Sequence, residues 1–322
     1  MNRTSVRDRR RTRTPRRPLL AVALSASALL LAACGGTSGT GGTAPAGPAP
    51  AASGAASASA HTAHAVVPEA AALLPADAKS KGTLTVATGE GYPPFEFYAA
   101  DNTTLQGVDP DLLGAVSESL GLKPDFQVLK FDAIIPGMQG GRYDVAAAAM
   151  GITPARNKVV DFVSYFQGGT SIMFPKGNPK GLTLDTMCGH TIAVQKGTIY
   201  ATDYMPEFTK KCTDAGQPAI TIDTYPDQPS AALAVSSNRA DATMDDFGPL
   251  AYVSQQSNDR FEVLDANYSP APYGIAMDKG SALAPAIEKA LEALVADGTY
   301  AKVLDQWGVS AGAITDPAVS RG

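Results

Sequence analysis

The sequence predicts an α/β fold, because short apolar segments alternate with segments that have helical spacing of apolar residues. Strands are expected at 83–87, 125–129 and 145–150, with helices at 109–121 and 132–139 between them. A second cycle of this alternation begins at residue 191 and continues to a helix expected from about residue 247. The pattern is typical of mostly parallel sheets covered by helices on both faces, and its repetition predicts two lobes of similar architecture.

Capping residues mark several of the expected elements. Asp109 is expected to cap the helix at 109–121, with Pro110 in its first turn and Gly121 at its end. The second cycle consists of expected strands at 191–194, 220–223 and 240–244 and helices at 198–211, 229–236 and from 247. Extended segments at 159–162 and 171–174 precede it, and a strand at 273–277 and core-facing helices at 281–296 and 299–307 follow.

The first 33 residues have the composition of an export signal. Residues 1–18 contain eight arginines and one acid, and residues 19–33 form an uninterrupted run of apolar and small side chains that is too short for an ordinary membrane span. The run ends in Leu31-Ala-Ala-Cys34, which resembles the lipobox of bacterial lipoproteins. We therefore expect export and a lipid anchor on Cys34 at the outer face of the bacterial cytoplasmic membrane. A free Cys34 after a plain signal peptide is the alternative, and Arg16-Arg17 leaves a twin-arginine route open.

Residues 34–72 consist almost wholly of Gly, Ala, Ser, Thr and Pro, a composition that buries too little apolar surface to offset the entropy lost on ordering. We expect a disordered tether here. His61 and His64 are interpreted as solvated linker residues rather than metal ligands, because no third ligand is near. Neither a metal nor a cofactor is expected, and residues 309–322 are interpreted as a C-terminal tail.

The charge balance argues against a nucleic-acid partner. Without the signal, Lys plus Arg falls from 26 to 18 and Asp plus Glu from 31 to 30, which leaves a net charge near −12. So acidic a body is a poor nucleic-acid binder.

The cysteines predict one disulfide. With Cys34 assigned to lipid, Cys188 and Cys212 remain as a pair in an oxidising compartment, and we expect them to be bridged. Closing a loop of about 25 residues stabilises the fold by roughly 3 kcal/mol in the chain-entropy model.

Arg156 is a candidate binding residue because of its position after the expected strand at 145–150. Thr153 can cap and Pro154 can begin a helix there, which places Arg156 one turn into the helix. Ligands of open α/β sheets bind at the carboxyl ends of strands, where free N–H groups and a guanidinium can receive a carboxylate. A surface arginine on a capping turn is the alternative.

Seven stretches together resemble the amino-acid-binding family of extracellular solute-binding proteins that serve ABC importers. They occur in the family's order: Tyr92-Pro-Pro-Phe-Glu-Phe97, Gly107-Val-Asp-Pro-Asp-Leu112, Phe131-Asp-Ala-Ile-Ile-Pro136, Gly151-Ile-Thr-Pro-Ala-Arg156 with Val160-Asp-Phe162, Ile192-Ala-Val-Gln-Lys-Gly-Thr198, Asp241-Ala-Thr-Met-Asp-Asp246 and Asp297-Gly-Thr-Tyr300. The resemblance implies a two-lobed periplasmic-binding-protein-like fold of type II, with two hinge crossings. Lobe 1 is expected at 82–168 plus 272–308 and lobe 2 at 172–266. The resemblance also implies a monomer whose partners are a free amino acid and the ABC permease.

The resemblance assigns roles to residues at matching positions. Arg156 should bind the ligand α-carboxylate with N–H groups around Gly151, and Asp246 should bind the α-ammonium. Tyr92 and Phe131 should enclose the ligand side chain. The turn at Gly197-Thr198-Ile199 should present N–H groups from lobe 2. Thr153 is interpreted mainly as a cap, Phe131 alternatively as core and Asp246 alternatively as a helix cap.

Departures from the family pattern bear on specificity. Gly151 and Ile199 replace residues that commonly carry hydroxyl groups. The family has an acid three residues before the first aromatic residue. That position is Gly89 here, and the next residue is the acid Glu90. Asp245 and Gln195 occupy positions that often contact the ligand side chain. The additional acids favour a basic or amide side chain over an acidic one.

Two other functions are compatible with these patterns. One is an exported dehydratase of the cyclohexadienyl or arogenate type, for which Glu90 is the candidate general acid. The other is a sensor subunit that presents its ligand to a membrane partner. We expect a binding protein rather than an enzyme, because the three histidines, His61, His64 and His190, belong to no Ser/His/Asp or Cys/His set.

Overall fold

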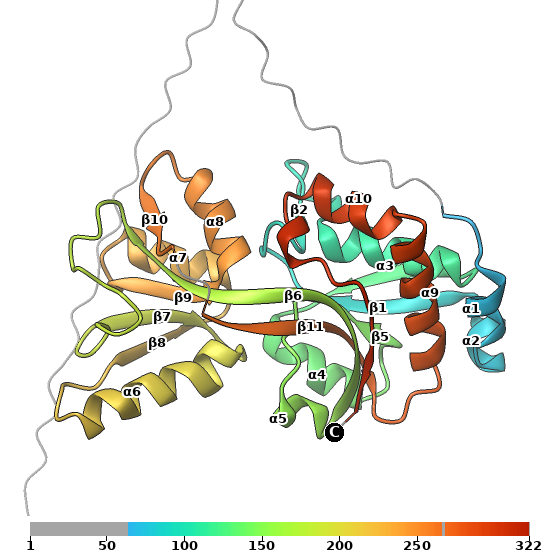
Figure 1. Ribbon diagram of the computed structural model, residues 1–322, viewed down its shortest axis with the longest axis horizontal. Coiled ribbons are helices and arrows are strands. Elements are labelled where there is room, and N and C mark those ends of the chain that lie inside the picture. The colour runs from blue at the N-terminus through green and yellow to red at the C-terminus, as the bar shows by residue number, and fades with distance from the viewer. Residues whose placement is uncertain (1–63, 266–267, 322) are drawn as a thin grey trace, which may run out of the picture. The chain divides into compact units, whose positions relative to one another are not determined.

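The computed structural model describes residues 64–265 and 268–321 (Figure 1). The expected signal segment, Cys34 and most of the expected tether lie outside the described residues. The helices are α1 (Pro68–Ala72), α2 (Ala76–Lys81), α3 (Val108–Ser119), α4 (Phe131–Gln139), α5 (Pro154–Asn157), the π-helix η1 (Tyr200–Tyr204), α6 (Met205–Asp214), α7 (Gln228–Ser236), α8 (Phe247–Gln255), α9 (Ala284–Ala296), α10 (Thr299–Gln306) and the 3-10 helix η2 (Ser310–Gly312). The strands are β1 (Thr83–Thr88), β2 (Phe97–Tyr98), β3 (Leu105–Gln106), β4 (Lys123–Val128), β5 (Val145–Ala146), β6 (Val160–Pro175), β7 (Thr191–Gln195), β8 (Thr221–Tyr225), β9 (Ala242–Asp246), β10 (Phe261–Val263), β11 (Tyr268–Asp278) and β12 (Val319–Ser320).

One mixed sheet runs through both lobes in the order β4-β1-β5-β11-β6-β9-β7-β8. Its outer parts are parallel: β4, β1 and β5 in lobe 1, and β8, β7 and β9 in lobe 2. The antiparallel strands β6 and β11 are long enough to cross from one lobe to the other (Figure 1). The predicted α/β fold with two lobes and two crossings is therefore confirmed.

Apolar side chains cover both faces of the sheet in each lobe. In lobe 1, one cluster contains Leu291 of α9 and another contains Met138 of α4. In lobe 2, Phe208 of α6 and Leu250 of α8 belong to two further clusters. No helix among the described residues is long and apolar enough to cross a bilayer.

The expected disulfide between Cys188 and Cys212 is confirmed. It joins the segment before β7 to α6 within lobe 2, with Cα atoms 5.5 Å apart.

The expected helix cap at Asp109 is wrong. Helix α3 begins one residue earlier, with Gly107 at the N-cap position, and Asp109 is buried. Its carboxylate accepts hydrogen bonds from the Tyr165 hydroxyl at 2.6 Å and the Ala149 N–H at 2.8 Å. A buried backbone N–H requires an acceptor, so this carboxylate serves the loop after β5 rather than its own helix.

His64 is not the solvated linker residue that composition suggested. Its imidazole Nε2 lies 2.8 Å from Asp297 and its Nδ1 lies 2.9 Å from the Ser119 hydroxyl. Helix α1, also within the expected tether, places Ala70 in the core of lobe 1. Small alanine side chains suffice here because helices of lobe 1 already provide the surface against which α1 packs.

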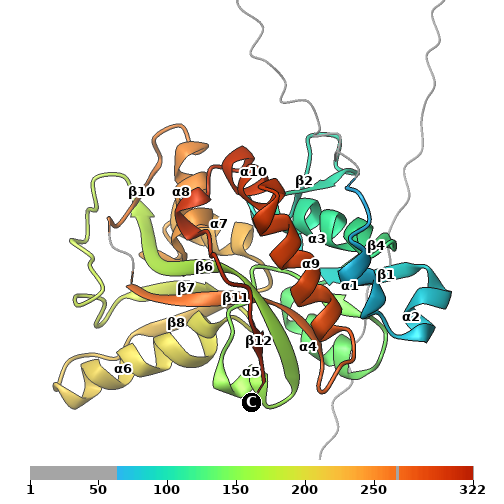
Figure 2. The same cartoon turned by 45° about the vertical axis from the view of Figure 1, so that its right-hand side comes forward.

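The end of the chain adds a strand to the sheet. Within the expected tail, β12 pairs antiparallel with β6, with Val319 opposite Val163 and Ser320 opposite Phe162 (Figure 2). The side-chain amide of Asn157, the last residue of α5, donates to the Ser320 hydroxyl at 2.9 Å.

Candidate functional site

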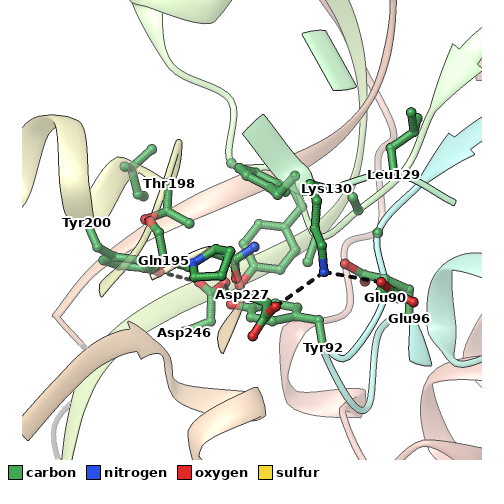
Figure 3. A pocket seen from close by; sticks show the side chains of 18 of the residues that line it. Glu90, Tyr92, Glu96, Leu129, Lys130, Gln195, Thr198, Tyr200, Asp227 and Asp246 are labelled. Carbon is green, nitrogen blue, oxygen red and sulfur yellow. Dashed lines mark hydrogen bonds and ion pairs between the residues drawn. The ribbon is translucent and has the colours of Figure 1, made fainter. Parts of the chain in front are cut away.

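A cavity lies between the lobes where strands of both halves end. Its walls include residues that follow β1, β4 and β5 in lobe 1 and β7, β8 and β9 in lobe 2, as the carboxyl-end rule for α/β sheets predicts. Most of the residues expected to bind ligand contribute to its lining: Glu90, Tyr92, Phe131, Gly151, Arg156, Gln195, Thr198, Ile199 and Asp246. The lining also contains Tyr273, which was not expected, and four further unexpected residues that Figure 3 labels: Glu96, Lys130, Tyr200 and Asp227.

Arg156 lies in the wall of this cavity. Thr153 caps α5 and accepts a hydrogen bond from the Arg156 N–H at 3.1 Å, as predicted. The guanidinium donates from Nη1 to the Gly151 carbonyl at 2.6 Å and from Nη2 to the Gly197 carbonyl of lobe 2 at 3.1 Å. It also lies 5.4 Å from the centre of the Phe131 ring. Burial lowers the pKa of Arg156, yet a guanidinium remains a cation with five N–H donors, more than these two carbonyls use.

Asp246 is the last residue of β9 and lies in the cavity wall. Its carboxylate accepts hydrogen bonds from the hydroxyl of Tyr92 in lobe 1 and from that of Tyr200 in lobe 2, the latter at 2.5 Å. Burial raises the pKa of Asp246, while the hydroxyls of Tyr200, Tyr273 and Tyr92 oppose that shift. Asp246 precedes α8 but makes no side-chain capping bond, so its carboxylate is directed to the tyrosines rather than to the helix.

Asp245 lies behind this wall rather than in it. It is fully buried, and its Oδ1 accepts hydrogen bonds from the Tyr92 hydroxyl at 2.6 Å and the Asp246 N–H at 2.9 Å. Burial first, and the neighbouring Asp246 second, raise the pKa of Asp245 well above its usual range. The structure therefore places Asp245 as a support for Tyr92 and not among the cavity-lining residues.

Gln195, Thr198 and Ile199 bring the lobe 2 turn to the cavity. The Thr198 hydroxyl donates to the Gln195 carbonyl at 2.7 Å and so closes the turn before η1. Gly197 has φ +81°, and a Cβ there would lie 2.9 Å from the Cβ of Asp132 in lobe 1, so only glycine permits this approach. Its carbonyl, rather than an N–H group, faces Arg156.

Glu96 and Asp109 form a buried acid pair beside the cavity. Burial first, and then the neighbouring carboxyl group of Asp109, raise the pKa of Glu96 well above its usual range. Burial also raises the pKa of Asp109 to about 6, against hydrogen bonds from Tyr165, Ala149 and Glu96. The two carboxyl groups thus share a proton near neutral pH. Glu96 lies within the stretch Tyr92–Phe97, but nothing in its local pattern signalled a buried acid.

A lysine bridges the lobes at the outer end of the cavity. Lys130 of lobe 1 lies 3.3 Å from Glu90 of the same lobe and 3.3 Å from Asp227 of lobe 2 (Figure 3). Asp227 also caps α7, accepting from the Ser230 N–H at 3.0 Å through its other oxygen. A second pair, Lys196 and Asp132, joins the lobes at 2.9 Å outside the cavity lining.

The unexpected tyrosines come from parts of the chain with no sequence signal for binding. Tyr273 lies on the crossing strand β11, and Tyr200 begins η1. Both are buried, and burial raises their pKa values well above the usual range. In the described part of the chain, no group of three or more His, Cys, Asp and Glu side chains is arranged to hold a metal ion.

This chain is similar to known proteins in sequence and in fold. Residues 84–310 match the family of bacterial extracellular solute-binding proteins, family 3. The chain belongs to that family. The matched range contains every cavity-lining residue.

Several known proteins are similar to this chain over most of their length. The arginine-binding protein ArgT of Corynebacterium glutamicum is 31% identical over 254 residues, which are 79% of this chain and 83% of that protein. A solved ancestral arginine-binding protein bound to arginine superposes with a TM-score of 0.64 and 37% identity, covering 70% of this chain and 98% of that one. The ancestral amino acid-binding protein AncCDT-1, described as a precursor of cyclohexadienyl dehydratase, has a TM-score of 0.64 and 31% identity, covering 72% and 97%.

Proposed function

We propose that this chain is the substrate-binding component of an amino-acid ABC importer and binds a polar L-amino acid with a basic or amide side chain. The observation that carries the proposal is the placement of Arg156 in lobe 1 and Asp246 in lobe 2 on the walls of one cavity. A zwitterion has a carboxylate and an ammonium, and opposite charges on two lobes can bind both. The named arginine-binding relatives support an amino acid as the ligand.

The two lobes have different tasks in this mechanism. The ligand carboxylate binds Arg156 and the N–H groups near Gly151 while the lobes are apart, because both belong to lobe 1. Asp246 then receives the ammonium, displacing hydroxyl groups of the surrounding tyrosines. Only contacts present in the closed form favour closure, so Asp246 and the Gly197 turn drive it. The closed form is the shape delivered to the permease.

Calorimetry with a panel of amino acids tests this function. Arg156→Met should weaken binding by about 100-fold, because charge-assisted hydrogen bonds contribute roughly 1.5 to 3 kcal/mol each. Arg142→Met removes a cation near Tyr143, outside the cavity lining, and should leave affinity unchanged. Equal affinities for the Arg156→Met and Arg142→Met proteins, or no amino acid that binds the unchanged protein, would refute the proposal.

We further propose export with a lipid on Cys34 and function as a monomer. The arginine-rich segment, the apolar run and the Leu31–Cys34 motif support the lipid anchor. Mass spectrometry of the mature N-terminus should find a lipidated Cys34, and Cys34→Ser should release the protein from membranes. An unmodified cysteine in the membrane-bound protein would contradict the anchor.

One observation favours a dehydratase as the second candidate. Burial raises the pKa of Glu96 well above its usual range, so this carboxyl group in the cavity wall is a better candidate general acid than the ion-paired Glu90. We nevertheless propose a binding protein, because the similar proteins include arginine-binding proteins and AncCDT-1 is itself described as amino acid-binding. Incubation with prephenate and arogenate should give no turnover. Product formation that is lost in Glu96→Gln would establish the enzyme instead.

A further inference from the structure

The outer end of the cavity is built from carboxylates on both lobes. Glu90 follows β1 in lobe 1, and Asp227 follows β8 in lobe 2. Their carboxylates approach each other closely enough for the single ammonium of Lys130 to contact both. Opposed carboxylates across a cleft form a site that a cation can occupy only when the lobes are together.

The charges of the cavity lining do not cancel. It contains four carboxyl groups, those of Glu90, Glu96, Asp227 and Asp246, but only two cations, Lys130 and Arg156. With Glu96 protonated, one negative charge remains. A zwitterionic ligand with a neutral side chain leaves that charge uncompensated, whereas a ligand with a cationic side chain neutralises it. The excess negative charge attracts a cation, so the lining favours the cationic ligand.

An unused hydrogen-bond acceptor points in the same direction. Glu96 is only 2% exposed, lines the same cavity and has an oxygen, Oε2, without a hydrogen-bond partner among the described residues. In Figure 3 its side chain lies beside that of Glu90. Buried polar atoms are rarely left unpaired, so a ligand with several N–H donors would complete this wall.

We infer that Glu90 and Asp227 bind the cationic end of a basic amino-acid side chain, with Glu96 accepting a further hydrogen bond and Lys130 holding the outer carboxylates together. This inference rests on the proposed function, because Arg156 and Asp246 bind the other end of the same ligand. Lys130 acts as a competing cation: it keeps the two carboxylates in place but offsets one of their charges. It thereby limits how strongly the cavity prefers a positively charged side chain.

The ratio of affinities for arginine and citrulline measures this preference. Citrulline has the length of arginine, with a neutral urea group in place of the guanidinium. Calorimetry on the full chain should show arginine binding about tenfold more tightly or better. Asp227→Asn retains a good helix cap for α7, and both it and Glu90→Gln should lower the ratio by about threefold to fivefold. Lys130→Gln should raise the ratio by a similar factor.

A matched variant separates charge recognition from lobe closure. Asp132→Asn breaks the other ion pair between the lobes without changing the cavity lining, so it should leave the arginine-to-citrulline ratio unchanged. Equal affinities for the two ligands, or a ratio insensitive to both Asp227→Asn and Glu90→Gln, would overturn the inference while leaving the proposed function intact. If no amino acid binds at all, the proposed function itself fails and this inference fails with it.

Discussion

The hydroxyl of Tyr92 in lobe 1 donates a hydrogen bond to the carboxylate of Asp246 in lobe 2. The same hydroxyl contacts the neighbouring Asp245, so one phenol joins the wall of one lobe to two acids of the other. Arg156 makes a comparable contact in the same direction, from lobe 1 to the Gly197 carbonyl. The polar contacts between the lobes therefore involve the same groups that we propose to bind a zwitterion.

Removing the Tyr92 hydroxyl should favour the open form. Tyr92→Phe removes the single hydroxyl that contacts both acids, and a hydrogen bond to a charged group contributes about 1.5 to 3 kcal/mol. Small-angle X-ray scattering of the ligand-free protein should show a larger radius of gyration. Tyr98→Phe, in β2 of lobe 1, is the matched control and should leave the scattering curve unchanged. Identical curves for the two variants would contradict a closing role for Tyr92.

Replacing Glu96 by glutamine should change how stability depends on pH. The pKa values of Glu96 and Asp109 are raised in the folded protein, Asp109 to about 6, so the folded state binds protons more tightly than the unfolded state. The contribution of this pair to the free energy of unfolding therefore falls as pH rises from about 4 through the folded pKa values. Glu96→Gln removes one titrating group, so its free energy of unfolding should increase relative to that of the unchanged protein as pH rises through this range.

Urea unfolding at several pH values between 4 and 8 measures this difference. Glu69→Gln, an exposed change in α1, is the control and should run parallel to the unchanged protein. A stability difference between the Glu96→Gln protein and the unchanged protein that stays constant with pH would show that the acid pair is not protonated as proposed.

The disulfide should stabilise lobe 2 without affecting binding. Replacing Cys188 and Cys212 together by serine should lower the free energy of unfolding by about 3 kcal/mol, as expected for a loop of this length. Neither cysteine lines the cavity, so ligand affinity measured by calorimetry should be unchanged. A large loss of affinity in the folded double variant would instead couple the bridge to the binding site.

Gly168 should tolerate no side chain, because it packs under a cavity residue. A Cβ at Gly168 would lie 2.2 Å from the hydroxyl oxygen of Tyr273, on the opposite crossing strand. Gly168→Ala should therefore lower the unfolding temperature, at a cost of about 1 to 3 kcal/mol, and weaken ligand binding. Gly248→Ala has its nearest contact at 3.8 Å and serves as the control. Equal unfolding temperatures for both variants would show that Tyr273 moves aside freely.

Local patterns predicted much of the framework. Alternating apolar segments predicted the α/β lobes, and the Thr153-Pro154 pair predicted the cap and first turn of α5 that present Arg156. The expected oxidising compartment and the number of cysteines predicted the disulfide between Cys188 and Cys212. These features depend on residues close together in the chain or on composition, which can be evaluated without knowledge of the fold.

Long-range packing alone decided which polar groups meet in the cavity. Tyr92 and Asp246 are 154 residues apart, and Lys130 and Asp227 are 97 residues apart. No periodicity or capping rule relates such positions, because they come together only when strand ends of two lobes face each other across the cleft. Burial then alters the chemistry: it raises the pKa of Asp109 to about 6, and this carboxyl group accepts a hydrogen bond from the Ala149 N–H instead of capping its own helix.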